Sequence, residues 1–67
     1  MRIQVNGREL QVDQESLTIH GLLEELGYLN NFVAVAINET CVPRHDYTAY
    51  RVSDRDRVEI LAPMAGG

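Results

Sequence analysis

Residues 1–12 read MRIQVNGRELQV, and this stretch decides how the fold begins. Apolar and polar residues alternate on both sides of Asn6-Gly7, with Ile3 and Val5 before it and Leu10 and Val12 after it. Both central residues of a type I′ turn need a positive φ, which Asn and Gly tolerate. The stretch therefore predicts a β-hairpin with strands over about 2–6 and 8–12.

A helix is predicted after the polar residues 13–16. The apolar residues there recur at i, i+3, i+4 and i+7, which is the spacing of one helix face: Ile19, Leu22, Leu23 and Leu26. Thr18 can cap the first turn with its hydroxyl, and Gly27 stands where a left-handed residue commonly ends a helix. We expect a helix over 19–26, weakened by Gly21 in its first turn by about 1 kcal/mol relative to Ala.

The rest of the chain predicts three more strands. Residues 33–37 alternate bulky and small, Asn38-Glu39 can form a turn, and a short strand over 40–42 ends at Pro43. Residues 45–50 suggest a loop with at most one helical turn. Asp54-Arg55-Asp56 forms a turn before a strand over 57–62 in which Val58 and Ile60 face inward and Glu59 outward. The order ββ-α-ββ-β predicts an α+β fold, a mixed five-stranded sheet packed on one helix in the β-grasp arrangement.

Composition narrows the class of protein. The 67 residues carry a formal charge of −4, with no basic run, which argues against nucleic acid as a partner. The single Cys and two His offer neither an internal disulfide nor a zinc ligand set, so we expect no bound metal. We find no apolar run long enough for a signal peptide or a membrane span, and we expect a cytoplasmic location and protein partners. A core this small also makes a deep catalytic cleft improbable.

Several polar side chains have a simple structural interpretation. Cys41 is predicted to be a small buried hydrophobe, because no base near it in sequence would form a thiolate. His20 and His45 are predicted to be solvated, and Glu24 and Glu25 to form a solvated helix surface.

The end of the sequence carries the functional signal. We expect one domain over residues 1–62 and a flexible tail over 63–67, in which no side chain beyond Met64 is larger than methyl. Two glycines without Cβ atoms let a terminal carboxylate enter a narrow channel of another protein. A carboxylate can also attack the α-phosphate of ATP, giving an acyl-adenylate that a sulfur nucleophile can attack. By itself a Gly-Gly end is more simply a frayed terminus.

A flat apolar patch is predicted on the outward face of the sheet. It would comprise Ala34, Ala36 and Leu61, and it would dock a partner such as an activating enzyme. The alternative is a small sheet face that the 45–50 loop partly covers.

The sequence resembles the ThiS family, the sulfur carriers of thiamine biosynthesis, over essentially its whole length. The matching stretches are Thr18–Leu26, Val35–Asn38 leading to Val42-Pro43-Arg44, Asp56–Ile60 and the terminal Ala65-Gly66-Gly67. Arg55 stands where relatives commonly carry Gly, so the turn type there is open, and Gly21 stands where they often carry Glu.

This resemblance implies a ubiquitin-like β-grasp fold and a protein that is not itself an enzyme. It implies that a ubiquitin-activating-type adenylyltransferase adenylates the Gly67 carboxylate with ATP and that the product becomes a thiocarboxylate. The tail residues Ala65, Gly66 and Gly67 would thread the partner's active site. The sulfur would come from a donor such as a cysteine desulfurase and pass to thiazole synthase. No cofactor would be bound by the carrier.

Three alternatives stay open. The small subunit of molybdopterin synthase has a similar fold and tail, although its chains are usually longer and the Val42-Pro43-Arg44 context favours the thiamine branch. A protein modifier would join Gly67 to a lysine amine, but such tails often carry Arg before the glycines. The third is a β-grasp binding module with no covalent role.

Overall fold

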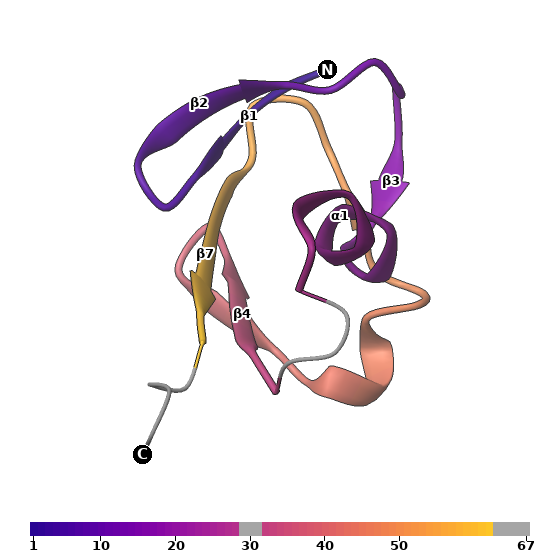
Figure 1. Cartoon of the computed structure of the whole chain (residues 1–67), viewed down its shortest axis with the longest axis vertical. Coiled ribbons are helices and arrows are strands. Elements are labelled where there is room, and N and C mark those ends of the chain that lie inside the picture. Colours follow the sequence, from indigo (N-terminus) through magenta and orange to yellow (C-terminus); the bar gives the residue numbers. More distant parts are fainter. Residues whose placement is uncertain (29–31, 63–67) are drawn as a thin grey trace.

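The structure is a computed structural model that describes residues 1–28 and 32–62. A five-stranded mixed sheet in the spatial order β2-β1-β7-β4-β5 lies against one helix, α1 (Figure 1). The strands of this sheet are β1 (Arg2–Val5), β2 (Arg8–Gln11), β4 (Ala34–Ile37), β5 (Thr40–Val42) and β7 (Arg57–Leu61). The predicted fold class is confirmed.

The first hairpin forms as its sequence predicts. β1 and β2 pair antiparallel, and the two residues between them have positive φ, 50° at Asn6 and 82° at Gly7. The pairing continues past the strand ends, because the Val12 N–H donates to the Met1 carbonyl over 2.8 Å. The strands are one residue shorter at their C-terminal ends than predicted.

Helix α1 spans Ile19–Leu26, the predicted range. The Thr18 hydroxyl accepts a hydrogen bond from the Gly21 N–H over 3.0 Å, and Gly27 ends the helix with a φ of 84°. A Cβ on Gly21 would lie 2.9 Å from Leu17 Cδ1. The glycine that weakens the first turn therefore also leaves room for the Leu17 side chain.

β7 occupies the centre of the sheet. β4 and β5 form a second hairpin through Asn38 and Glu39, which have φ values of 50° and 72°. β7 then pairs parallel with β1 on one side and antiparallel with β4 on the other. The last strand of the chain thus joins the two hairpins into one sheet.

A second, two-stranded sheet was not predicted. It pairs β3 (Leu17–Thr18) antiparallel with β6 (Arg51–Val52), at the entrance to α1. Two residues are too few to show an alternating pattern, so the sequence carried no local signal for either strand. The segment predicted as a loop with a helical turn, 45–50, overlaps one short 3₁₀ helix, η1 (Arg44–Asp46), which begins one residue earlier than that segment.

The core lies between the sheet and α1. Its buried members are Ile3, Val12, Ile19, Leu22, Leu23, Val33, Val35, Ile37, Val42, Tyr47, Val52, Val58 and Ile60. Val58 and Ile60 face inward and Glu59 is exposed, as the alternation predicts. Among the described residues, no helix has the length and apolar character needed to cross a membrane.

Candidate functional site

The candidate site begins where β7 ends. Leu61 is the last residue of the strand, and Ala62 is the last residue that the structure describes. The predicted tail, including Ala65, Gly66 and Gly67, lies outside the described residues. What the structure provides is the strand that leads to the tail and the surface around Leu61.

Two asparagines hold β7 from opposite edges. On the β1 side, Asn6 Oδ1 accepts from the Ile60 N–H over 2.7 Å and Asn6 Nδ2 donates to the Ile60 carbonyl over 3.2 Å. On the β4 side, Asn38 Oδ1 accepts from the Arg57 N–H over 2.9 Å. We interpreted both residues from the sequence only as turn formers, and an Asn at a turn gives no signal that its amide will reach a third strand.

The predicted docking patch is brought together on the outer face of the sheet. Ala34 lies opposite Leu61, and Ala36 lies between Glu59 and Cys41 on the neighbouring strands. Leu61 is 72% exposed, Ala34 is exposed and Ala36 is half-buried. The 45–50 loop does not cover this patch, because it is bonded to the other layer: the Tyr47 and Tyr50 carbonyls accept from backbone N–H groups of α1.

The prediction for Cys41 is wrong, because this side chain is exposed. Val42 is buried, and successive residues of a strand face opposite sides. Cys41 therefore belongs to the outer face, beside Ala36. Strand alternation was the signal that should have overridden the general tendency of Cys to be buried.

Phe32 is an exposed residue near the patch that we did not single out from the sequence. It precedes β4, is 73% exposed and carries the Arg44 guanidinium 4.8 Å from the centre of its ring. The spacing Phe32, Ala34, Ala36 was a usable signal, since alternate residues of an extended chain share a side. Phe32 thus adds an aromatic surface near the Ala34 end of β4.

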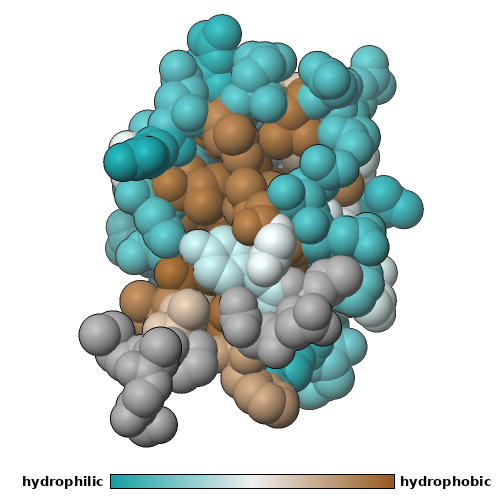
Figure 2. All heavy atoms as spheres, viewed as in Figure 1, coloured by the Kyte–Doolittle hydropathy of each residue, from teal (hydrophilic) through white to brown (hydrophobic). Residues whose placement is uncertain are grey.

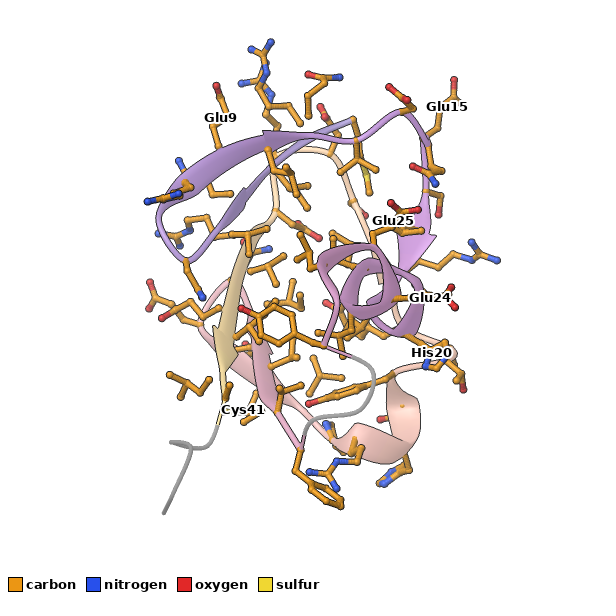
Figure 3. The ribbon with its side chains drawn as sticks, viewed as in Figure 1. Glu9, Glu15, His20, Glu24, Glu25 and Cys41 are labelled. Carbon is orange, nitrogen blue, oxygen red and sulfur yellow. The ribbon has the colours of Figure 1, made fainter. Side chains whose placement is uncertain are left out.

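The remaining polar candidates are solvated, as predicted. His20, Glu24 and Glu25 are exposed, His20 and Glu24 point away from the molecule in Figure 3, and His45 is exposed with its Nε2 3.6 Å from Asp46 Oδ1. Within residues 1–28 and 32–62, no group of three or more His, Cys, Asp or Glu side chains could hold a metal ion.

One carboxyl has a shifted pKa. The Arg2 backbone N–H donates to Asp54 Oδ1 over 2.7 Å and holds the pKa of that carboxyl below its usual value, with a smaller contribution from the charge of Arg55. This contact ties the start of β1 to the turn before β7. It is a structural contact far from the Leu61 end of the sheet.

Within residues 1–28 and 32–62, the sheet order, one α-helix packed on the sheet and the central position of β7 define a ubiquitin-like β-grasp protein. The ThiS family model matches residues 2–67, and the chain belongs to the ThiS family. It is a sulfur carrier in thiamine biosynthesis, as predicted.

Known relatives agree with this assignment. The crystal structure of the thiamine biosynthesis protein ThiS from Geobacter metallireducens superposes with a TM-score of 0.87 at 38% identity, with all of both chains covered. The sulfur carrier protein ThiS of Escherichia coli K12 is 34% identical over the full length of both chains.

A third relative is longer. A thiazole synthase from Paramagnetospirillum magneticum is 39% identical over 100% of this chain, which spans only 20% of that protein. A thiazole synthase therefore contains a segment similar to this chain.

Proposed function

We propose that the carboxylate of Gly67 is the group that carries the sulfur. The observation that supports this most is the family match, which continues through residue 67 of a chain belonging to a family of sulfur carriers. β7, held on both edges by Asn6 and Asn38, provides a fixed base for a short tail over residues 63–67. In this proposal residues 1–62 are the folded domain.

The proposed chemistry needs no acid, base or metal from the carrier. A Gly67 carboxylate oxygen attacks the α-phosphate of ATP in the active site of an adenylyltransferase, and pyrophosphate leaves. A hydrosulfide ion then attacks the carbonyl carbon of the acyl-adenylate, AMP leaves, and loss of the S–H proton gives the thiocarboxylate. If the donor presents a persulfide instead, the attack gives an acyl disulfide, and a second thiol must cleave its S–S bond to release the thiocarboxylate and a new disulfide. The carrier is thus a substrate of its partner enzymes and not a catalyst. Its cytoplasmic location stays a prediction from the sequence.

Thiazole synthase is the proposed acceptor of the sulfur. The relative that joins a segment similar to this chain to the rest of a thiazole synthase supports this choice, because two functions in one chain commonly work together. A ubiquitin-activating-type adenylyltransferase and a sulfur donor such as a cysteine desulfurase complete the set of proposed partners.

The exposed patch of Ala34, Ala36 and Leu61 is the proposed docking face for the activating enzyme. Leu61 adjoins the predicted tail, so a partner that covers this residue lies within reach of Gly67. Exposed apolar area on a domain this small commonly marks an interface. The family assignment does not favour the molybdopterin synthase subunit, the protein modifier or the plain binding module.

Intact mass spectrometry tests the proposal. The full chain is produced with its activating enzyme, ATP and a sulfur source, next to a variant that lacks Gly67. We expect a mass gain equal to one oxygen exchanged for sulfur, confined to the C-terminal peptide and absent from the variant. Covalent attachment to lysines of other proteins would instead identify a modifier, and an unchanged mass would argue for a plain binding module.

A further inference from the structure

A groove on the helix side of the molecule has no role in the function proposed above. It consists of two adjoining hollows between β2 and α1, of about 520 Å³ and about 290 Å³, which share Leu10 and Leu26 as lining residues. Figure 2 shows apolar surface along the middle of this face, between hydrophilic rims. Leu10, Leu26 and Tyr28 are only partly buried against the core, so this lining meets solvent.

One wall of the groove is an open strand edge. β2 is at the end of the sheet order, and among the described residues it pairs only with β1. Met1 and Val12 are joined by backbone hydrogen bonds in both directions. In an antiparallel pair of strands, hydrogen-bonded residue pairs alternate with pairs that are not hydrogen-bonded to each other. The register therefore turns the backbone N–H and C=O groups of Glu9 and Gln11 away from β1, toward the open edge.

The two ends of the groove differ in charge. Arg8 and Glu9 line the end near Tyr28, where Glu9 Oε1 also lies 3.8 Å from Arg2 Nε, whereas the other end has the carboxylates of Asp13 and Glu25 and no basic side chain among its described lining residues. Figure 3 shows Glu25 pointing from α1 toward the segment that links β2 and β3, while Glu24 points elsewhere. Within the described part of the chain, Asp13 and Glu25 have no ion-pair partner.

We propose that this groove binds an extended peptide segment of a partner protein, apolar in its middle and basic at its N-terminal end, as an added strand on β2. Its backbone pairs with Glu9 and Gln11, which is the geometry of β-strand addition. Its apolar side chains lie on Leu10 and Leu26. An antiparallel peptide starts at the Asp13 end of β2, so its basic residues meet Asp13 and Glu25.

A second copy of this chain fits the groove less well. Its own β2 buries Val12 and part of Leu10 in its own core, so these side chains have little apolar surface left to fill a neighbour's groove. The apolar side chains of an extended peptide segment are not packed on a core of their own, so they can fill the groove. The groove also lies on the side of the sheet opposite to Leu61, so a partner bound there leaves the proposed docking face open.

The test is a titration of the ¹⁵N-labelled full chain with the blocked peptide Lys-Lys-Val-Ile-Val-Thr-Glu. We expect saturable amide shifts that centre on Glu9, Gln11 and Leu26. We also expect at least about fivefold weaker binding of the charge-swapped peptide Glu-Glu-Val-Ile-Val-Thr-Lys. Binding should also weaken as salt is raised.

Two variants isolate the parts of the groove. Glu25→Lys should weaken binding by at least about fivefold, whereas Glu24→Lys, its neighbour outside the groove, should leave binding unchanged. Gln11→Pro should weaken binding at least about tenfold, because it removes an edge N–H. Pro is tolerated where the N–H of an edge strand faces solvent, and the amide spectrum reports whether the variant is folded.

Three results would overturn the proposal. The first is that the peptide causes no saturable change in the amide spectrum. The second is that Glu24→Lys and Glu25→Lys weaken peptide binding equally. The third is that the amide shifts change with protein concentration when no peptide is present, and that this change is lost in Gln11→Pro. The last would assign the edge to a second copy of the chain. None of these readouts involves Gly67, so they stand apart from the test of sulfur transfer.

Discussion

At the scale of single residues, Arg55 combines a long side chain with a backbone conformation that glycine favours. Arg55 has a φ of 72°, in the left-handed region that costs a residue with a Cβ roughly 1–2 kcal/mol. This answers the question that the sequence left open, since the turn adopts the conformation that glycine favours even though it carries Arg. The Arg55 N–H donates to the Arg2 carbonyl, which helps to hold the strained residue in place.

We expect Arg55→Gly to raise the free energy of unfolding by up to about 1 kcal/mol, because glycine adopts this φ without strain although it loses more backbone entropy on folding. Urea denaturation measures the change. Arg55→Ala is the matched control, because it removes the side chain that lies 3.6 Å from Asp54 but keeps the strain. Equal stability of the two variants would contradict this account.

Asp54 is expected to make stability depend on pH. Its pKa is lower in the folded chain, so the unfolded chain binds more protons at acid pH. The contribution is fully present above the unfolded pKa of about 3.9 and is lost as pH falls through the lower folded value.

Urea denaturation of the protein and of Asp54→Asn over a series of acid pH values checks this dependence. The stability difference between the two chains should shrink as pH falls below about 4, because protonation removes the same charge as the substitution. A difference that stays constant with pH would show that the carboxylate charge is not what the Arg2 N–H stabilises.

At the scale of secondary-structure elements, side chains form hydrogen bonds with the backbone of a strand at positions beyond the end of its neighbouring strand. Tyr47 comes from the segment after η1, and its hydroxyl accepts from the Val35 N–H over 3.0 Å and donates to the Val33 carbonyl over 3.3 Å. Asn6 does the same for β7 at Ile60. These polar contacts fix the ends of β4 and β7.

Tyr47→Phe should destabilise the protein by about 1–3 kcal/mol, because it leaves the buried Val35 N–H without an acceptor. Tyr50→Phe is the control, since no hydrogen bond of its hydroxyl is found among the described residues and its side chain is 38% exposed. Chemical denaturation of both variants provides the comparison. Similar losses in the two would argue against a specific role of the Tyr47 hydroxyl.

Asn6→Gly separates the two roles of this asparagine. Glycine keeps the positive φ of the turn but removes both amide bonds to Ile60, so we expect a loss of about 1–2 kcal/mol. Native-state hydrogen exchange should become faster at the Ile60 amide in particular. Glu39→Gly, at a turn residue with a φ of 72°, should not change exchange at Ile60. Unchanged protection of the Ile60 amide in Asn6→Gly would show that the Asn6 side chain does not hold β7 at Ile60.

At the scale of the whole molecule, patterns among residues close in sequence predicted the main elements of the fold. Pairings between residues far apart in sequence, such as β3 with β6, were not predicted. The Asn6-Gly7 turn, the Thr18 cap and the Ile19–Leu26 face each depend on neighbours in sequence, and the structure has all three. The β3–β6 sheet depends on pairing Leu17 with Val52, far apart in sequence.

The candidate site was predicted in part for the same reason. Alternation along each strand placed Ala34 of β4 and Leu61 of β7 on the outer face, where the structure has them. It also placed Cys41 there, but the usual burial of Cys was given more weight than its position next to Val42. The tail over residues 63–67 stays a prediction from the chemistry of Gly66 and Gly67.

Two regions of the outer face of the sheet are expected to respond differently to an added charge. Ala36→Glu places a carboxylate beside Glu59 within the proposed docking face, and we expect at least about tenfold lower kcat/KM for adenylation. Gln4→Glu adds the same charge elsewhere on the outer face and should have little effect. An unchanged rate in Ala36→Glu would reject this face as the docking surface.

The central place of β7 also has a mechanical consequence. A force that an enzyme applies to the C-terminal end of the chain acts along β7. The neighbouring strands β1 and β4, to which β7 is hydrogen-bonded, are parallel to this force. Inter-strand bonds stand across the strands, so such a load shears many of them together instead of unzipping them singly. The β-grasp domain is therefore suited to stay folded while another protein handles its terminus.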